Sequence, residues 1–234
     1  MACALPELRR VGTVELLDHD LLPGSAAGPA APGPLLLLHG FGDDKTALRA
    51  IGDTLCPTGS VAVYPSLRAH GASPAPKWGY SPLDFAADVQ RILDPVPGPL
   101  HVIGYSYGAL VAAVLGVALG PHRISSVVLL DQSFERLPDR YEADEWAEAS
   151  FLKWHYDYRH LLDALDGLGI RVLSVVARQS SVVPEAERGR MLARAQRGGL
   201  FSCVVTDGTH QSFLTNHAIE IIAEFYGRSM ETRT

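Results

Sequence analysis

The sequence lacks any apolar run long enough to cross a membrane. A spanning helix needs about 20 mostly apolar residues, and the longest apolar stretch here, Ala109 to Leu119, is shorter. No apolar segment follows Arg9 and Arg10 near the amino terminus, so the pattern of a secretory signal peptide is missing. We therefore expect a cytoplasmic protein without a membrane span.

Cysteine is also scarce, and basic residues form no cluster. Cys3, Cys56 and Cys203 are odd in number and widely spaced, so they predict neither a disulfide framework nor a metal site. The 20 basic and 26 acidic residues leave a net charge of −6 without a basic block. Nucleic-acid binding is therefore not expected, because surfaces that bind nucleic acid are basic.

What the sequence does contain is enough apolar material for one folded domain. Its 234 residues are 47% hydrophobic, and short apolar runs alternate with stretches of helical pattern. Such alternation is typical of a parallel sheet with helices on both faces, so we predict an α/β fold over residues 1–234 as a single domain. The predicted strands are Leu35–Leu38, Val61–Tyr64, Leu100–Ile103, Ser126–Leu130, Val172–Val176 and Phe201–Val205. The predicted helices are Thr46–Leu55, Pro82–Leu93, Tyr107–Leu119, Pro184–Arg197 and Gln211–Tyr226.

Two segments depart from this alternation. Arg10–Leu17 has the pattern of an additional strand at the edge of the sheet, and the stretch from Pro23 to Pro34, rich in Ala, Gly and Pro, predicts a surface loop. Phe134–Leu168 has no strand pattern, many charges and a cluster of aromatic residues. We interpret it as a small helical lid inserted over one end of the sheet.

The strongest functional signal is the pentapeptide Gly104-Tyr105-Ser106-Tyr107-Gly108, which joins a predicted strand to a predicted helix. A Gly-x-Ser-x-Gly turn at such a junction forces the serine into a strained backbone conformation, with its hydroxyl over the sheet edge. Both glycines are needed, because a Cβ at either position would collide with neighbouring backbone. The N–H groups at the start of the helix favour a developing negative charge. Ser106 is therefore a candidate nucleophile.

A second motif lies at the end of the first buried strand. The segment Leu35 to Gly42, LLLLHGFG, ends in a His-Gly turn. Together with the serine turn, it resembles the α/β-hydrolase superfamily, and the resemblance covers most of the chain. It implies a mostly parallel sheet flanked by helices, and an oxyanion hole formed by the backbone N–H groups of Phe41 and Tyr107. The loop Pro65–Ser73 is also similar to a loop of the superfamily. The resemblance implies that His39 and His70, which lies in this loop, are structural residues.

A serine nucleophile needs a base, and His210 has the position that the superfamily uses. In that family the histidine comes last, on a loop after the final strand. His210 follows the predicted strand Phe201–Val205 and precedes the last predicted helix. His217 lies inside the pattern of that helix and is expected to be a surface or core residue. We therefore predict His210 as the general base.

The usual acid of the superfamily is missing. Many members carry it after the strand equivalent to Val172–Val176, shortly before a Val-Pro pair. Here the Val-Pro pair is kept, but Ser180 occupies the carboxylate position. Neither Ser180 nor Gln179 can carry the negative charge that stabilises an imidazolium.

A replacement carboxylate lies one strand earlier. Asp131 directly follows the predicted strand Ser126–Leu130. The thioesterase domains of polyketide and non-ribosomal peptide assembly lines are similar in this respect, since they place their acid after this strand. We therefore predict Asp131 as the acid of a Ser-His-Asp triad, with Asp207, three residues before His210, as a weaker alternative.

The resemblance implies a hydrolase that acts through an acyl-Ser106 intermediate and needs no metal or organic cofactor. Esters, thioesters and lactones suit this chemistry, and the acid position favours a biosynthetic thioesterase or esterase. Its partner would be a small-molecule acyl substrate, free or bound to a carrier protein. In the predicted lid, Trp146, Trp154 and Tyr158 would either line the substrate pocket or anchor the lid to the body.

Two alternatives stay open at this point. In the first, this chain is a member of the same fold family that keeps Ser106 and His210 but catalyses cyclisation, acyl transfer to an acceptor other than water, or C–C bond cleavage. A non-catalytic binding protein is the other alternative, and the retained Ser106 and His210 argue against it, because a binding protein has no need of a strained serine turn.

Overall fold

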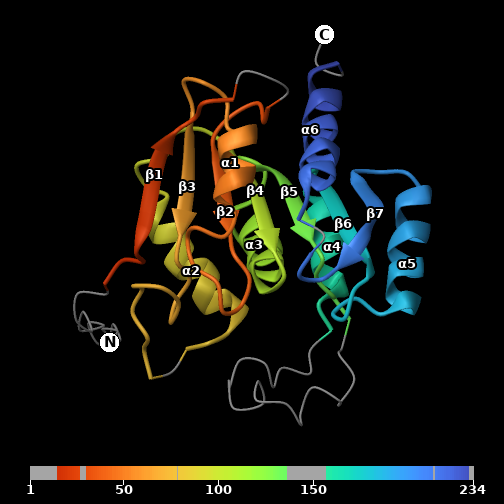
Figure 1. Cartoon of the computed structure of the whole chain (residues 1–234), viewed down its shortest axis with the longest axis horizontal. Coiled ribbons are helices and arrows are strands. Elements are labelled where there is room, and N and C mark those ends of the chain that lie inside the picture. The colour runs from red at the N-terminus through yellow and green to blue at the C-terminus, as the bar shows by residue number, and fades with distance from the viewer. Residues whose placement is uncertain (1–14, 27–29, 78, 136–156, 213, 232–234) are drawn as a thin grey trace, which may run out of the picture.

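The protein is built around one seven-stranded sheet (Figure 1). The structure is a computed structural model that describes residues 15–26, 30–77, 79–135, 157–212 and 214–231. The strand order is β1-β3-β2-β4-β5-β6-β7, and every pairing is parallel except that of β1 with β3. The strands are β1 (His19–Pro23), β2 (Leu35–Leu38), β3 (Val61–Pro65), β4 (Leu100–Tyr105), β5 (Ile124–Leu130), β6 (Arg171–Gln179) and β7 (Phe201–Thr209).

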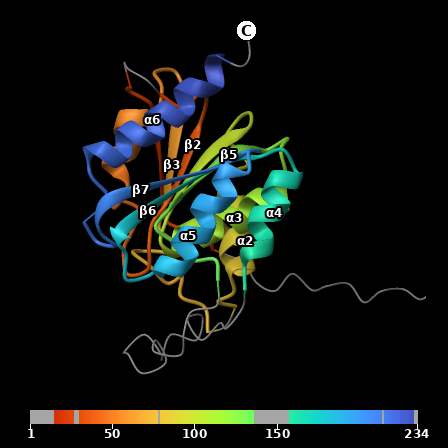
Figure 2. The same cartoon turned by 90° about the vertical axis from the view of Figure 1, so that its right-hand side faces the viewer.

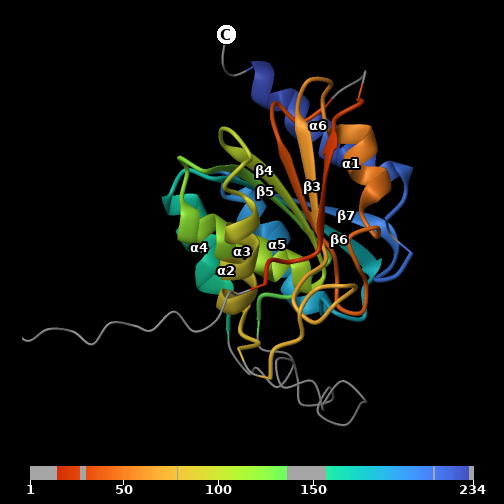
Figure 3. The same ribbon diagram turned by 90° about the vertical axis from the view of Figure 1, so that its left-hand side faces the viewer.

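Helices cover both faces of the sheet, as the two side views show (Figure 2 and Figure 3). The helices are α1 (Arg49–Leu55), α2 (Pro82–Ile92), α3 (Tyr107–Leu119), α4 (Arg159–Gly167), α5 (Glu185–Gln196) and α6 (Asn216–Glu231). On one face lie α2, α3, α4 and α5, and on the other lie α1 and α6. The sequence alternation predicts this two-sided burial.

Each buried strand contributes alternate side chains to the two cores. In β2, Leu36 and Leu38 pack with α2 and α3, whereas Leu35 and Leu37 pack with α1 and α6. All four are at most 2% exposed. A run of consecutive leucines therefore suits this strand, because successive side chains of a strand point to opposite faces and here both faces are buried.

The strand order reverses its direction at β2. From β2 the chain passes to β3 on one side, and then returns to place β4 on the other side of β2. Open α/β sheets bind ligands where the order reverses in this way, outside the carboxyl ends of the strands. The loops after β2 and β4, which contain Phe41 and Ser106, both leave the sheet at this point.

The first strand differs from the prediction. Of the predicted edge strand Arg10–Leu17, residues 10–14 lie outside the described part, and residues 15–17 are not in a strand. Instead β1 spans His19–Pro23 and pairs antiparallel with β3. Its sequence, HDLLP, has little apolar alternation, so the strand arises from pairing with its neighbour rather than from a local pattern. Helix α6 also begins later than predicted, at Asn216.

The insertion predicted over Phe134–Leu168 is only partly described, since residues 136–156 lie outside the described part. Its last section forms α4, which packs against α3 and β6 in the helical layer and buries Leu161, Leu162 and Leu165. The predicted lid is therefore too wide at this end. Among the described helices, none is both long and apolar enough to cross a membrane.

Candidate active site

Ser106 stands at a strained turn between β4 and α3. Its backbone angles are φ 51° and ψ −126°, a conformation that residues other than glycine rarely adopt. Its N–H donates to the carbonyl oxygen of Leu130 at 2.8 Å, which ties the turn to the end of β5. The side chain remains half-exposed at the carboxyl edge of the sheet.

The two glycines of the turn are required by close backbone contacts. A Cβ at Gly104 would lie 2.3 Å from the carbonyl oxygen of Gly108. A Cβ at Gly108 would lie 2.3 Å from the carbonyl oxygen of Leu38 and 2.4 Å from that of His39. These contacts, which the sequence predicts, bring the start of α3 directly against the end of β2.

A chain of hydrogen bonds links Ser106, His210 and Asp131. The Nε2 atom of His210 lies 3.0 Å from the Oγ atom of Ser106, and its Nδ1 atom lies 2.7 Å from the Oδ2 atom of Asp131. In the tautomer whose Nδ1–H donates to the Asp131 carboxylate, Nε2 is left to accept from the serine hydroxyl. The structure therefore brings together the three side chains that the sequence predicts as a triad.

Asp131 is fully buried and its carboxylate is held from several sides. Its Oδ1 atom accepts from the N–H of Ala177 at 2.8 Å, and its Oδ2 atom accepts from the hydroxyl of Ser180 at 2.7 Å. The Ser180 hydroxyl in turn accepts from the N–H groups of Val182 and Val183. The serine at the usual acid position is thus a hydrogen-bond donor to the carboxylate on the neighbouring strand.

Asp207, the alternative acid, pairs with an arginine at the surface. Its carboxylate pairs with the guanidinium of Arg178 at 2.7 Å, and its side chain is 87% exposed. Asp131 therefore lies within hydrogen-bond distance of His210, whereas the described contact of Asp207 is a solvated ion pair.

Tyr105 supports the histidine from the strand side. Its ring stacks on that of His210, with 5.1 Å between centroids and 26° between planes, and its hydroxyl donates to the carbonyl oxygen of His210 at 2.8 Å. Burial, reinforced by the charges of Asp43 and Asp131, raises the pKa of Tyr105 to about 12. It therefore stays neutral and fixes the position of the histidine loop.

The loop after β2 is organised by His39. This histidine is 1% exposed, its Nδ1–H donates to the carbonyl oxygen of Gly40 at 2.7 Å, and its Nε2 accepts from the N–H of Leu67 at 2.9 Å. Burial lowers the pKa of His39 to about 4. Phe41 follows this turn and packs edge-on to His70, with 5.3 Å between ring centroids. Both histidines are buried, and their structural role stays a prediction.

The predicted lid residues have different outcomes. Trp146 and Trp154 lie outside the described residues. Tyr158 is half-buried just before α4, packs against the main core and donates its N–H to the carbonyl oxygen of Phe134 at 2.8 Å. Its contact with substrate stays a prediction.

A family profile described as the alpha/beta hydrolase fold matches residues 33–159, more than half of the chain. The chain belongs to the α/β-hydrolase fold family. The predicted resemblance and the predicted fold class are therefore confirmed. No curated protein sequence matches this hydrolase-fold chain.

Solved structures match nearly the whole length of the hydrolase fold. The thioesterase domain from the curacin biosynthetic pathway is 17% identical with a TM-score of 0.63, over 91% of this chain and 99% of that one. A thermophilic esterase from Thermogutta terrifontis is 17% identical with a TM-score of 0.67, over 91% and 93%. The enol-lactonase from Burkholderia xenovorans is 18% identical with a TM-score of 0.64, over 89% and 95%. At these identities the likeness concerns the fold.

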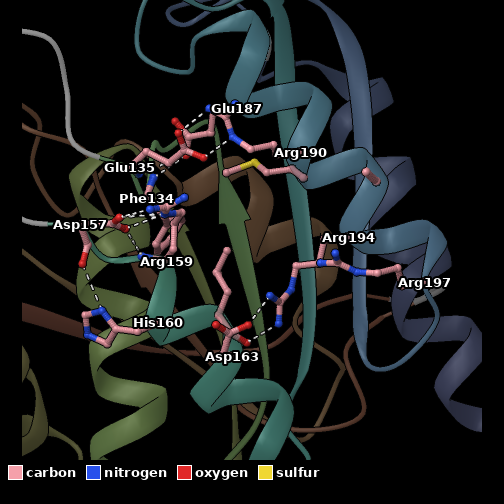
Figure 4. A pocket seen from close by; sticks show the side chains of 13 residues that line it. Phe134, Glu135, Asp157, Arg159, His160, Asp163, Glu187, Arg190, Arg194 and Arg197 are labelled. Atoms are coloured by element: carbon pink, nitrogen blue, oxygen red, sulfur yellow. Dashed lines mark hydrogen bonds and ion pairs between the residues drawn. The ribbon is translucent and has the colours of Figure 1, made fainter.

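A charged cavity of about 700 Å³ lies between α4 and α5 of this hydrolase fold (Figure 4). Arginines of α5 pair across it, Arg190 with Glu135 and Arg194 with Asp163. None of the three hydrogen-bonded residues Ser106, His210 and Asp131 lines it. The cavity is therefore separate from the site at the sheet edge.

Sequence reasoning missed two residues near the site, Tyr105 and Asp43. Tyr105 lies inside the serine motif, where its position directly before the nucleophile is a usable signal. Asp43 is half-buried beside the predicted oxyanion loop. Burial raises its pKa, while the N–H of Gly40 and the charges of nearby histidines, His210 among them, lower it. No local pattern marks Asp43, because its burial and its proximity to His70 and His210 depend on segments distant in the sequence.

Proposed function

We propose that this chain is a serine hydrolase that cleaves an ester or thioester, or a lactone, through an acyl-Ser106 intermediate. The observation that carries the proposal is the continuous hydrogen-bond chain from Ser106 through His210 to Asp131, with steps of 3.0 and 2.7 Å, at a strained strand–helix turn. A serine hydroxyl is a weak nucleophile by itself and needs an adjacent base that is oriented by a third group.

In the first half of the reaction, His210 accepts the Ser106 proton at Nε2 as the oxygen attacks the substrate carbonyl. Asp131 holds the Nδ1–H and balances the charge of the imidazolium. The backbone N–H groups of Phe41 and Tyr107 stabilise the oxyanion, a contribution of about 3 to 4 kcal/mol per donor at comparable sites. His210 then protonates the leaving group, and the acyl-Ser106 ester forms.

In the second half, water replaces the leaving group. His210 removes a proton from the water, the resulting hydroxide attacks the acyl ester, and the proton returns to Ser106 as the acid product leaves. The same histidine therefore serves both halves of the reaction and needs no external cofactor.

The substrate class is proposed from the acid position and from the named relatives. An acid on the loop after β5 is the arrangement that assembly-line thioesterases use, and the similar structures include a thioesterase domain, an esterase and an enol-lactonase. A small acyl substrate, free or attached to a carrier protein, accords with these. Thioesters and activated esters are therefore the first substrates to test.

A fluorophosphonate probe tests the mechanism without knowledge of the substrate. Wild-type protein should be labelled stoichiometrically at Ser106, and Ser106→Ala should lose all labelling with an unchanged circular dichroism spectrum. His210→Ala should lose labelling to a similar extent, and the double variant should be little worse, because the residues act as one unit. Matched p-nitrophenyl esters and acyl thioesters then identify the preferred leaving group.

Unlabelled wild-type protein would contradict the proposal. So would residual turnover by Ser106→Ala above about a thousandth of the wild-type rate, since loss of a triad nucleophile costs more than this.

A further inference from the structure

Two connecting segments at the edge of the sheet, one after β5 and one after β6, each bind a carboxylate of the other. The segment that leaves β5 contributes the Asp131 carboxylate, which is bound by Ala177 and Ser180 at the end of β6. In return, α5 contributes the Glu187 carboxylate, which is bound by the segment after β5. Each segment therefore holds the charged group of the other.

Glu187 is a buried carboxylate with well-defined partners. Its side chain lies in the first turn of α5 and the residue is only 2% exposed. Its Oε2 atom accepts from the Ser133 hydroxyl at 2.5 Å, and its Oε1 atom accepts from the N–H groups of Phe134 at 2.7 Å and Glu135 at 3.3 Å. Figure 4 shows Glu187 above Phe134 and Glu135.

The charge of Glu187 is costly unless these bonds are made. Burial raises the pKa of Glu187, whereas the bonds from Ser133 and Phe134 lower it. The start of α5 also favours a negative charge, because the N–H groups of its first turn have no partner within the helix and give that end a partial positive charge. The proposed reaction as described does not use Glu187, so its burial needs another explanation.

The segment that Glu187 holds begins at Ser133, two residues after Asp131. The backbone is strained at Asp131. Asp131 has a φ of 48°, a left-handed conformation that a residue with a side chain keeps only when its surroundings hold it. Its N–H is fixed by the carbonyl oxygen of Val175 at 2.8 Å. Beyond it, the carboxylate of Glu187 binds Ser133 and Phe134 from the side of α5.

We propose that Glu187 is a positioning residue that keeps the Asp131 carboxylate aligned with Nδ1 of His210. It acts through Ser133 and Phe134, which it fixes to α5. This inference rests on the proposed function, since it assigns Asp131 a task in the reaction. Loss of the Glu187 carboxylate lets the strained segment relax, and the 2.7 Å contact between Asp131 and His210 lengthens.

A double-mutant cycle of Glu187→Ala and Asp131→Asn tests this proposal. The readout is the second-order rate of fluorophosphonate labelling at Ser106, which depends on the basicity of His210. In the wild-type background, Glu187→Ala should slow labelling about tenfold, and in the Asp131→Asn background by less than about twofold, because the two residues act on the same contact. Glu187→Gln should recover part of the rate, since its amide can still bind Ser133 and Phe134.

A second readout follows the contact itself. The Nδ1 proton of His210, bound to a carboxylate, should give a far-downfield proton NMR signal in the wild-type protein and in Glu185→Gln. Glu185 is the matched control, because it lies in the same first turn but is exposed. Glu187→Ala should weaken or shift this signal. If that variant does not fold, Ser133→Ala, which removes only the hydroxyl donor, takes its place in the cycle.

Equal slowing in both backgrounds, or an unchanged downfield signal in Glu187→Ala, would overturn the positioning role. Failure of wild-type labelling contradicts the proposed function instead. The downfield signal then still decides whether Glu187 aligns Asp131 with His210.

Discussion

At the scale of single residues, the site depends on which of two neighbouring strand ends carries the carboxylate. The position after β6 carries a serine, and the position after β5 carries the carboxylate. The Ser180 hydroxyl donates to the Oδ2 atom of Asp131, the same atom that contacts His210. Because Ser180 also accepts from the N–H groups of Val182 and Val183, its hydroxyl direction is set by the backbone.

The first prediction concerns Asp131. Asp131→Asn should reduce kcat by roughly 10³ to 10⁴, because the amide neither balances the imidazolium nor enforces the tautomer with a free Nε2. Asp207→Asn is the control and should leave kcat nearly unchanged, because Asp207 pairs with Arg178 at the surface. Steady-state kinetics on one activated ester measures both, and a large loss in the control would assign the acid to Asp207.

The second prediction concerns Ser180. Ser180→Ala should lower kcat by less than about tenfold, because the Asp131 carboxylate keeps its place beside His210 and its hydrogen bond from the N–H of Ala177. Ser180→Asp in the Asp131→Asn background should recover part of the lost rate, since the Ser180 Oγ lies 2.7 Å from the carboxylate oxygen that contacts His210. Absence of any recovery would mean that a carboxylate on this strand end does not reach the same ring nitrogen.

At the scale of elements, the serine turn works because a strand and a helix pack without any side chain between them. Gly108, in the first turn of α3, lies against the carbonyl groups of Leu38 and His39, which brings the loop after β2 close to Ser106. That contact places Phe41 and Tyr107 at the same edge of the sheet. Rigid packing at this junction, rather than a flexible loop, therefore sets the geometry of the site.

The third prediction compares two glycine-to-alanine substitutions. Gly108→Ala should lower the free energy of unfolding by about 2 kcal/mol or more, because its Cβ meets two carbonyl oxygens that cannot move independently of β2. Gly189→Ala, inside α5, should raise it by about 0.5 to 1 kcal/mol, because its Cβ has open space and alanine favours a helix. Urea denaturation of the two variants measures both, and equal effects would refute the steric account.

At the scale of the whole molecule, burial of a neutral histidine couples stability to pH. His39 has a pKa of about 4 in the folded chain and of 6.5 when exposed. Between these values the unfolded chain binds the extra proton, so the free energy of unfolding rises with pH. The contribution is complete above pH 6.5 and is lost as the pH falls toward 4.

The fourth prediction follows from this difference. Between pH 7 and pH 5, the wild-type chain should lose about 2 kcal/mol more stability than His39→Gln, whose amide keeps a donor and an acceptor but does not titrate. His217→Gln should behave like the wild type, because His217 is exposed on α6. Urea denaturation at the two pH values gives the comparison. A wild-type loss no larger than that of His39→Gln would show that His39 does not remain neutral.

The sequence by itself determined the features that depend on local patterns. Consecutive apolar residues in Leu35–Leu38 predict a strand buried on both faces, and the bounds of α3 follow from the serine motif and the apolar run after it. The two glycines of that motif are explained by steric contacts within and around one turn. Such features are predictable because the residues that cause them lie next to one another.

Only the tertiary structure decided the contacts between distant residues. His210 meets Asp131 across 79 positions, Ser180 meets Asp131 across 49, and Glu187 meets Phe134 across 53. The same holds for β1, which exists through its pairing with β3, and for α4, which packs against α3 and β6. A sequence can supply several carboxylates near strand ends, but which one reaches the histidine depends on strand order and register, which long-range packing sets.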